Sequence, residues 1–175
     1  ARRVGEAVDD LFGRLLADQG DGRDTLFEAM RHAAIGGGKR LRPLLTVAAS
    51  RLFAIDEERA VRAGTAVEAI HVYSLIHDDL PCMDDDDLRR GRATVHRAYD
   101  EMTAVLAGDA LQAMAFEILA DPDTHDDPQV RADLTCKLAM AAGAQGMAGG
   151  QMIDMLGLGS DLNTVARMQR MKTGA

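Results

Sequence analysis

Apolar residues recur along most of the 175-residue chain at the three- to four-residue spacing of an amphipathic helix. Ala, Leu, Met, Glu and Arg dominate the composition, and these residues suit a helix better than β-branched or aromatic residues do. Aromatic residues make up 3% of the chain, and no Asn-Gly turn separates alternating runs of the kind that predict a β-hairpin. The pattern therefore predicts an all-α fold.

Turn and capping residues divide this pattern into seven predicted helices. Pro43 suits a first helical turn, Asp56 can cap a helix N-terminus, and Pro81 disfavours helix continuation through the residue before it. The predicted helices cover approximately residues 3–18, 24–34, 43–53, 57–79, 101–119, 129–155 and 161–175.

The amino-acid composition limits the number of domains, the partners and the location that can be expected for this chain. A hydrophobic content of 47% in 175 residues is enough for one core, so a single domain spanning residues 1–175 is expected. The net charge of −8 argues against nucleic acid or an anionic membrane surface as the main partner. The most apolar window, Leu138–Ile153, is too short to cross a bilayer, so no stable membrane anchor is expected. Cys82 and Cys136 form no CxxC pair, which favours a reducing, cytoplasmic location.

A glycine-rich motif, GGGKRLRP, occupies Gly36–Pro43. Its three cations follow glycines that permit close backbone approach and precede a helix whose N-terminal amides favour an anion. It is not a Walker loop, because Arg40 stands where Ser or Thr is required and no strand precedes it. The residues alone leave two equal alternatives, a phosphate-binding loop and a basic helix start that offsets the acidic total.

An aspartate-rich motif, HDDLPCMDDDDLRRG, occupies His77–Gly91 and holds six carboxylates. A run of like charge is usually a solvated surface segment. An EF-hand is excluded, because Leu88 and Val95 stand where calcium ligands are required. The loop after the helix can instead carry Asp84 back toward Asp78, and such carboxylates suit Mg²⁺.

Two arginines and a histidine accompany these carboxylates. Arg89 and Arg90 can bind phosphate in bidentate fashion. His71 lies two helical turns before Asp78 and should share its face, although a lone histidine is more often a packed or surface residue.

Together these motifs resemble those of the trans-type isoprenyl diphosphate synthases, the polyprenyl synthetase family that includes farnesyl and geranylgeranyl diphosphate synthases. GGGKRLRP is similar to the family's GGKRxRP, and HDDLPCMDDDDLRRG is similar to its first aspartate-rich motif, DDxxxxD, with the trailing RRG. GMAGGQMID, LAGDAL and the terminal KTG also have family counterparts. Several motifs in the family's order make the resemblance specific.

The resemblance implies the isoprenoid synthase fold, in which helices surround a central substrate cavity. It implies a prenyltransferase that condenses an allylic diphosphate, dimethylallyl or geranyl, with isopentenyl diphosphate in a Mg²⁺-dependent head-to-tail elongation. A homodimer is implied by the resemblance alone.

The resemblance also assigns residues. Asp78 and Asp84 would hold Mg²⁺, with Asp79 in support. The allylic diphosphate would be contacted by Arg89, Lys172 and Thr173, and isopentenyl diphosphate by Lys39, Arg42, His71 and Arg90. The catalytic set would be Asp78, Asp84, Arg89 and Lys172. Gln151 and Asp154 would face the cavity without a defined role, and Asp85, Asp86 and Asp87 stay unassigned.

Product length rests on a weaker resemblance. Tyr73, five positions before Asp78, is similar to a bulky residue that limits the tail pocket in the bacterial farnesyl-forming subgroup. An ideal helical wheel puts Ser74 nearest beneath Asp78, so geometry alone does not choose between the two. Farnesyl diphosphate is the expected product, and geranylgeranyl diphosphate is the alternative.

The family carries a second DDxxD motif, which does not occur within these 175 residues. The expectation is therefore that the chain is the N-terminal portion of a longer enzyme. A non-catalytic partner subunit of the same fold is a rival reading, against which the complete first motif argues. A terpene cyclase is a further rival, but it has no second diphosphate that would require Lys39, Arg42 and Arg90.

Overall fold

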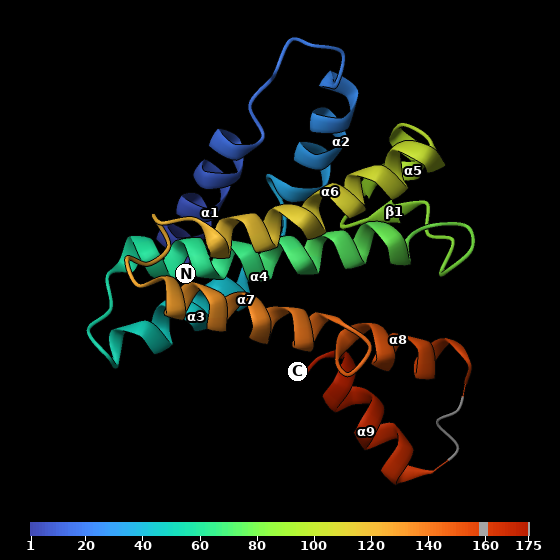
Figure 1. Ribbon diagram of the computed structural model, residues 1–175. Coiled ribbons are helices and arrows are strands. Elements are labelled where there is room, and N and C mark those ends of the chain that lie inside the picture. Colours follow the sequence, from blue (N-terminus) through green and yellow to red (C-terminus); the bar gives the residue numbers. More distant parts are fainter. Residues whose placement is uncertain (158–160, 175) are drawn as a thin grey trace. The chain divides into compact units, whose positions relative to one another are not determined.

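The computed structural model describes residues 1–157 and 161–174, and helices make up nearly all of the regular structure in these ranges, as predicted (Figure 1). The chain divides into two compact units, residues 1–126 and 127–175, each of which is described by itself.

The first unit holds six helices and a two-stranded hairpin. They are α1 (Arg2–Leu15), α2 (Asp24–Ala34), α3 (Leu41–Arg51), α4 (Glu57–Asp78), β1 (Leu88–Arg89), β2 (Arg92–Ala93), α5 (Val95–Ala98) and α6 (Glu101–Ala120). The second unit holds α7 (Pro128–Ala142), α8 (Met147–Met155) and α9 (Leu162–Lys172). The predicted end of the last helix, Ala175, lies outside the described residues.

Helix α4 is the centre of the first unit. It lies alongside α6, and α1 and α3 also pack against it (Figure 1). The core between these helices is apolar, and its largest fully buried members include Val8, Phe12, Leu16, Val47, Leu111 and Ile118. Asp56 caps α4 as predicted, because its carboxylate accepts hydrogen bonds from the amides of Glu58 at 2.9 Å and Arg59 at 3.1 Å.

Helix α6 is apolar around most of its circumference. Within the described part of the chain it is the one helix long and apolar enough to cross a membrane by length and composition. Half of that apolar stretch is buried inside the protein, and a core helix meets the same criteria.

Three features differ from the sequence prediction. The hairpin β1–β2 and the short helix α5 were not expected, and the single helix predicted over residues 129–155 is wrong. That segment breaks between α7 and α8, at Gly143 and Gly146. A Cβ on Gly146 would lie 1.9 Å from the carbonyl oxygen of Ala141, so this turn accepts no side chain.

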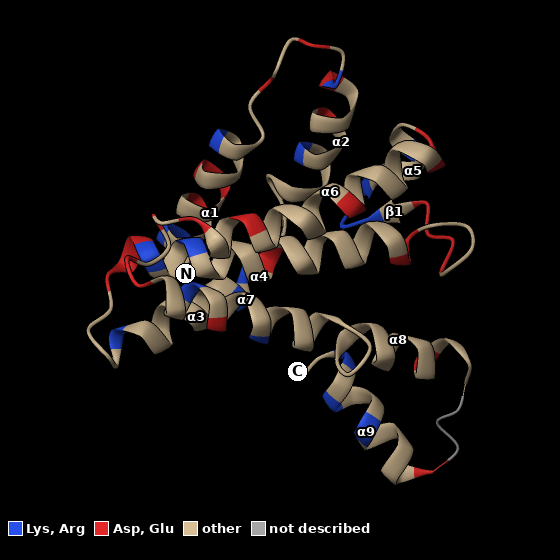
Figure 2. Cartoon of the chain, in the orientation of Figure 1, with Lys and Arg blue, Asp and Glu red and all other residues tan. Residues whose placement is uncertain are grey.

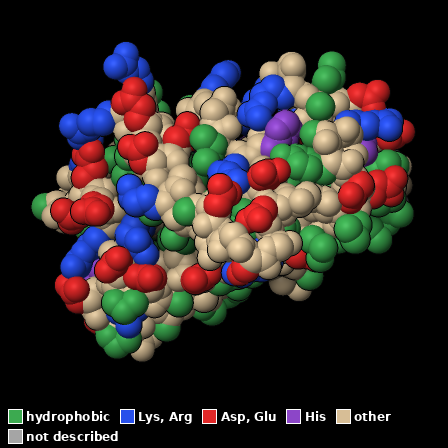
Figure 3. Space-filling view, turned by 90° about the horizontal axis from the view of Figure 1, so that it is seen from above, with side chains coloured by type: hydrophobic (Ala, Val, Ile, Leu, Met, Phe, Trp, Pro, Cys, Tyr) green, Lys and Arg blue, Asp and Glu red, His purple; other side chains and the backbone are tan. Residues whose placement is uncertain are grey.

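Charged residues of both signs occur along the helices (Figure 2). They are interspersed on the face that Figure 3 shows. Several ion pairs, such as Arg2–Glu6 and Arg51–Glu57, have two exposed side chains and contribute little because water screens them. The buried pair Arg40–Glu68 is different in kind, since both side chains are 5% exposed or less.

Gly64 allows α4 to approach α3 closely, and we expect its replacement by alanine to lower stability. A Cβ at position 64 would lie 2.9 Å from the Cα of Pro43, a backbone atom that cannot move without α3. Gly64→Ala should therefore lower the free energy of unfolding by about 1–3 kcal/mol, the usual cost of overpacking. Urea denaturation measures the change.

The matched control is Gly13→Ala on α1. Gly13 is exposed, and a Cβ there would meet no atom within 4 Å. This change should be neutral or raise stability by up to about 1 kcal/mol, because alanine favours a helix more than glycine does. Equal effects at the two positions would contradict the close α3–α4 contact.

Candidate functional site

The aspartate-rich loop doubles back onto the end of α4. The amide of Asp84 donates a hydrogen bond to the carbonyl of Asp78 at 2.9 Å, and the amide of Asp86 donates to the carbonyl of Asp79 at 3.2 Å. Asp85 makes the turn in the left-handed conformation, with φ of 53°, which Asp tolerates better than most residues. The predicted return of Asp84 to Asp78 is therefore confirmed at the level of the backbone.

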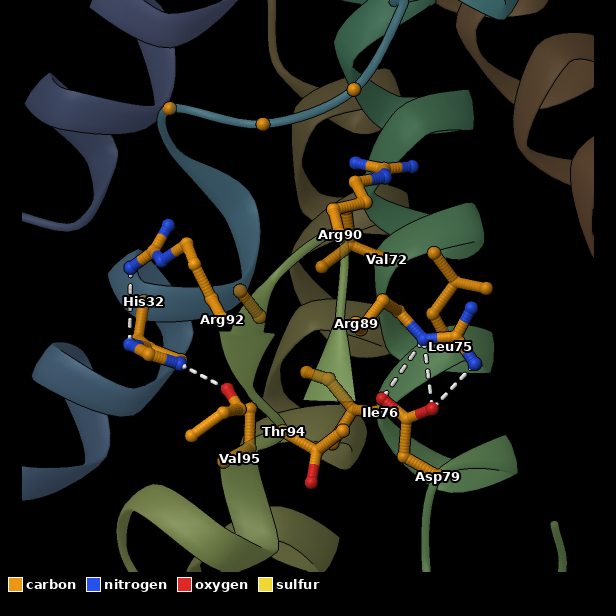
Figure 4. Close-up of a pocket in the computed structure, with 15 residues that line it drawn as sticks. His32, Val72, Leu75, Ile76, Asp79, Arg89, Arg90, Arg92, Thr94 and Val95 are labelled. Atoms are coloured by element: carbon orange, nitrogen blue, oxygen red, sulfur yellow. Dashed lines mark hydrogen bonds and ion pairs between the residues drawn. The ribbon is translucent and has the colours of Figure 1, made fainter. Parts of the chain in front are cut away.

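Asp79 is the buried carboxylate of the motif, and Arg89 neutralises it. Asp79 is 3% exposed, and its Oδ1 and Oδ2 accept hydrogen bonds from Arg89 Nε at 2.7 and 3.0 Å (Figure 4). These hydrogen bonds raise the pKa of the Arg89 guanidinium above its ordinary value. Asp79 therefore ties the hairpin to α4, and the resemblance had given it a supporting role.

The four aspartates of the loop, Asp84 to Asp87, are exposed, and two of them make surface contacts. Asp86 lies 3.4 Å from Arg89 Nη2, and Asp87 pairs with Arg97. Among the described residues there is no group of three or more Asp, Glu, His or Cys side chains that could hold a metal ion. The carboxylates of the half-buried Asp78 and the exposed Asp84 are hard oxygen donors at the point where the loop returns to α4. This donor set fits Mg²⁺, which commonly takes one or two carboxylates and completes its shell with water and substrate phosphate.

The hairpin places Arg90 in a strained turn. Its strands pair Leu88 with Ala93 and Arg89 with Arg92, so Arg90 and Gly91 form a two-residue connection. Both have positive φ, 53° and 79°, which is the pattern of a type I′ turn. A left-handed arginine is uncommon, and its guanidinium lies close to the glycine loop, where a Cβ on Gly38 would be 2.4 Å from Arg90 Nη1.

The three cationic side chains of the glycine motif lie in different environments. Lys39 is exposed and Arg42 is half-buried, but Arg40 is 6% exposed. The Arg40 guanidinium donates hydrogen bonds to Glu68 of α4 at 3.0 Å and also to Asp9 of α1 and the carbonyl of Ala34. Arg40 is therefore a structural cation, which the sequence analysis did not distinguish from its two neighbours.

Lys39, Arg42, His71 and Arg90, the four residues assigned to one substrate, line a common cavity of about 440 Å³. Burial and the nearby guanidinium groups, Arg42 and Arg90 first among them, lower the pKa of His71 to about 4. His71 is therefore neutral at pH 7, and cations outnumber carboxylates in the lining of this cavity although the chain is acidic.

A second cavity, of about 310 Å³, lies beneath the glycine loop and shares Gly38 and Arg90 with the first. Its walls come from α2, α4 and the hairpin (Figure 4). Apolar side chains of α4, namely Val72, Leu75 and Ile76, form one side. The guanidinium of Arg90 therefore borders both cavities.

Tyr73 lies in the seam between α4 and α6. It is 8% exposed, its ring meets that of His77 edge-on at 5.7 Å, and it is hydrogen-bonded to Gln112. Burial raises the pKa of the Tyr73 hydroxyl. Its predicted role as the floor of a tail pocket stays a prediction.

Lys172 and Thr173 belong to the second unit. Lys172 pairs with Asp154, and Gly150 of α8 packs directly on the backbone of Lys172, where a Cβ would lie 2.4 Å from its nitrogen. Sequence analysis left the role of Asp154 open, and in the structure its carboxylate pairs with Lys172 of the same unit. The predicted contact of Lys172 and Thr173 with an allylic diphosphate stays a prediction.

Sequence reasoning missed Asp9 and Glu68, which bind Arg40, and also His32 and Arg92, which join α2 to the hairpin. The dipeptide Arg90-Gly91 was a weak hairpin signal, but polar residues flank it and it lacks the usual Asn or Asp. For Asp9 and Glu68 no local signal exists.

Residues 23–175 match the family model described as polyprenyl synthetase. Farnesyl diphosphate synthase of Escherichia coli strain K12 is 48% identical over 151 residues, which cover 85% of this chain and 50% of that protein. A chloroplastic heterodimeric geranylgeranyl pyrophosphate synthase large subunit of Arabidopsis thaliana is 49% identical over 142 residues, 80% of this chain and 38% of that protein.

A crystal structure of an FPP/GFPP synthase from Zymomonas mobilis matches with a TM-score of 0.96 and 57% identity, over 99% of this chain and 64% of that one. The predicted isoprenoid synthase fold is thereby confirmed. The chain spans about half the length of the curated relatives it matches.

Proposed function

This chain belongs to the polyprenyl synthetase family, and on that premise we propose that its protein condenses an allylic diphosphate with isopentenyl diphosphate. The observation that carries the proposal is the cavity in which Lys39, Arg42 and Arg90 converge around His71. Arg40 and Glu68, which also line the cavity, are paired with each other, so the other three cations match a diphosphate in charge. A neutral His71 adds a hydrogen-bond donor for the same group.

Prenyl synthases of this family generally depend on a divalent metal, and we propose Mg²⁺ at Asp78 and Asp84. Bound there, it would stabilise the negative charge that develops on the departing diphosphate. Arg89 donates hydrogen bonds from Nε and Nη2 to Asp79. We assign its Nη1 to the departing diphosphate of the allylic substrate. Lys172 and Thr173 are assigned to this substrate through the family motif.

The proposed reaction needs no protein nucleophile. The allylic carbon–oxygen bond breaks and its electron pair leaves with diphosphate. The double bond of isopentenyl diphosphate then forms the new carbon–carbon bond, and a proton passes to the departing diphosphate. The chain's residues bind and orient the two substrates and stabilise the leaving group electrostatically, which is commonly the largest contribution to catalysis.

The test is an assay of the complete gene product with Mg²⁺, labelled isopentenyl diphosphate and either dimethylallyl or geranyl diphosphate. Incorporation of the label into a longer prenyl diphosphate is the expected result. A terpene cyclase would leave isopentenyl diphosphate unused, and a non-catalytic subunit would form no product. We further propose that the protein is a cytoplasmic homodimer, which size-exclusion chromatography with light scattering and cell fractionation would test.

Farnesyl diphosphate is the product we propose, with Tyr73 limiting the chain length. Tyr73→Ala should then shift the product toward geranylgeranyl diphosphate, as measured by chromatography of the dephosphorylated prenols. Leu11→Ala, which also truncates a buried side chain of this unit, is the control and should leave the product unchanged. An unchanged product in Tyr73→Ala would remove Tyr73 from this role.

The charge of a bound diphosphate should be visible in the titration of His71. Because burial and neighbouring arginines hold the pKa of His71 near 4, inorganic diphosphate in the same cavity should raise that pKa. NMR of the imidazole Hε1 signal against pH measures it, with His71→Gln for assignment. An unchanged pKa at saturating diphosphate would contradict the location of the site.

A further inference from the structure

His32 joins α2 to the hairpin through both of its ring nitrogens. Nε2 lies 2.8 Å from the carbonyl oxygen of Ala93, and Nδ1 lies 3.1 Å from Nη2 of Arg92 (Figure 4). A carbonyl can only accept and a guanidinium can only donate, so Nε2 carries the proton and Nδ1 accepts. His32 therefore bridges the hairpin as a neutral imidazole.

Arg92 makes a second contact with α2. Its Nη1 donates a hydrogen bond to the carbonyl of Ile35 at 3.2 Å, just before the glycine loop begins. Tyr99 packs edge-on against the His32 ring at 5.9 Å. The pair His32–Arg92, here called the clasp, thus fixes the distance between the C-terminal end of α2 and strand β2.

The clasp joins the two segments that adjoin Arg90, namely the end of α2 before the glycine loop and strand β2 after the turn. Helix α2 leads directly into Gly36–Gly38, against which the Arg90 guanidinium rests, and β2 follows directly from the turn that holds Arg90. Arg90 has a positive φ, which an arginine adopts only when its surroundings hold it there. On the opposite strand, Arg89 pairs with Arg92 and has its own bonds to Asp79.

We propose that His32 and Arg92 are positioning residues that hold Arg90 in place for the second diphosphate. This inference rests on the proposed function for the identity of that diphosphate. The clasp residues line the second cavity and not that of Lys39, Arg42 and His71, so we assign their effect to Arg90, which borders both. The substrate held by Arg89 should be little affected.

Kinetics of the complete gene product test the proposal. His32→Leu and Arg92→Leu should each raise KM for isopentenyl diphosphate about tenfold, since small displacements of a binding group cost that much or more. KM for the allylic substrate should stay within about twofold, because its assigned arginine keeps its own bonds to Asp79. Arg14→Leu, an exposed arginine on α1, is the control and should change neither constant.

Two conservative variants separate the bonds of the clasp. His32→Asn keeps an acceptor for Arg92, and His32→Gln keeps a donor that can reach the carbonyl of Ala93. Each should reverse part of the rise in KM that His32→Leu causes. A purely structural role of His32 in α2 would give no such rescue, and equal loss in all three variants would overturn the proposal.

A double-mutant cycle shows whether the clasp acts through Arg90. Arg90→Ala combined with His32→Leu should bind no more weakly than Arg90→Ala alone. Fully additive effects, or a rise in both KM values together, would overturn the proposal. Calorimetric titration with inorganic diphosphate repeats the cycle without turnover, so an inactive protein would refute the proposed function while the clasp is still tested.

Discussion

Asp84→Asn is expected to lower kcat/KM about a thousandfold, because removal of a group that stabilises the charge of the transition state typically costs 10²–10³-fold or more. The substitution removes one negative charge and little else. The loop is held by the Asp84 main-chain amide, which bonds to the Asp78 carbonyl at 2.9 Å and survives the change. Steady-state kinetics at fixed and at raised Mg²⁺ measure the loss, and raised Mg²⁺ should recover part of it.

Asp85→Asn is the matched control for Asp84. Asp85 is the next residue in the same exposed loop, and asparagine tolerates its left-handed conformation as well as aspartate does. The variant should keep activity within about threefold, which is the screened effect of one surface charge. If the two variants lose activity equally, the motif acts through its total charge, and the assignment of Asp84 as a ligand is wrong.

Arg40→Met should lower the free energy of unfolding by about 3–5 kcal/mol, the usual cost of leaving one partner of a buried ion pair without the other. Glu68 is 3% exposed and would keep a buried carboxylate next to an apolar side chain. Asp9 is about one-third exposed and can recover hydration. Urea or thermal denaturation measures the loss.

Arg40→Met combined with Glu68→Leu should recover most of that stability, since removal of both buried charges is often neutral. The control is Arg51→Met, whose partner Glu57 is exposed, and its cost should stay below about 1 kcal/mol. A double variant that is less stable than Arg40→Met would contradict the pairing.

The helices were predictable because their signals are local. The N-cap at Asp56, the glycines after α2 and Pro81 after α4 all act within a few residues of the boundary they set. The break at Gly143 and Gly146 was missed because an isolated glycine is also tolerated inside a helix. The helix breaks there because the Ala141 carbonyl lies close to Gly146, and the spacing of residues in the sequence does not reveal that contact.

The motifs that make up the site were predictable from the sequence, but the spatial arrangement of their side chains was not. The return of Asp84 to Asp78 followed from Pro81 and loop length. The inward direction of Arg40 did not, because Lys39, Arg40 and Arg42 carry the same charge in one motif. Its direction depends on two carboxylates 31 and 28 residues away in the chain.

The tight turn at Arg90 and Gly91 has a consequence for efforts to stabilise this protein. Asparagine or glycine at position 90 would relieve the left-handed strain, so a library screened for thermostability alone should enrich both. Each would remove the guanidinium that borders both cavities. Position 90 is therefore a place where selection for heat resistance alone would discard the proposed substrate contact without any sign of it in the melting curve.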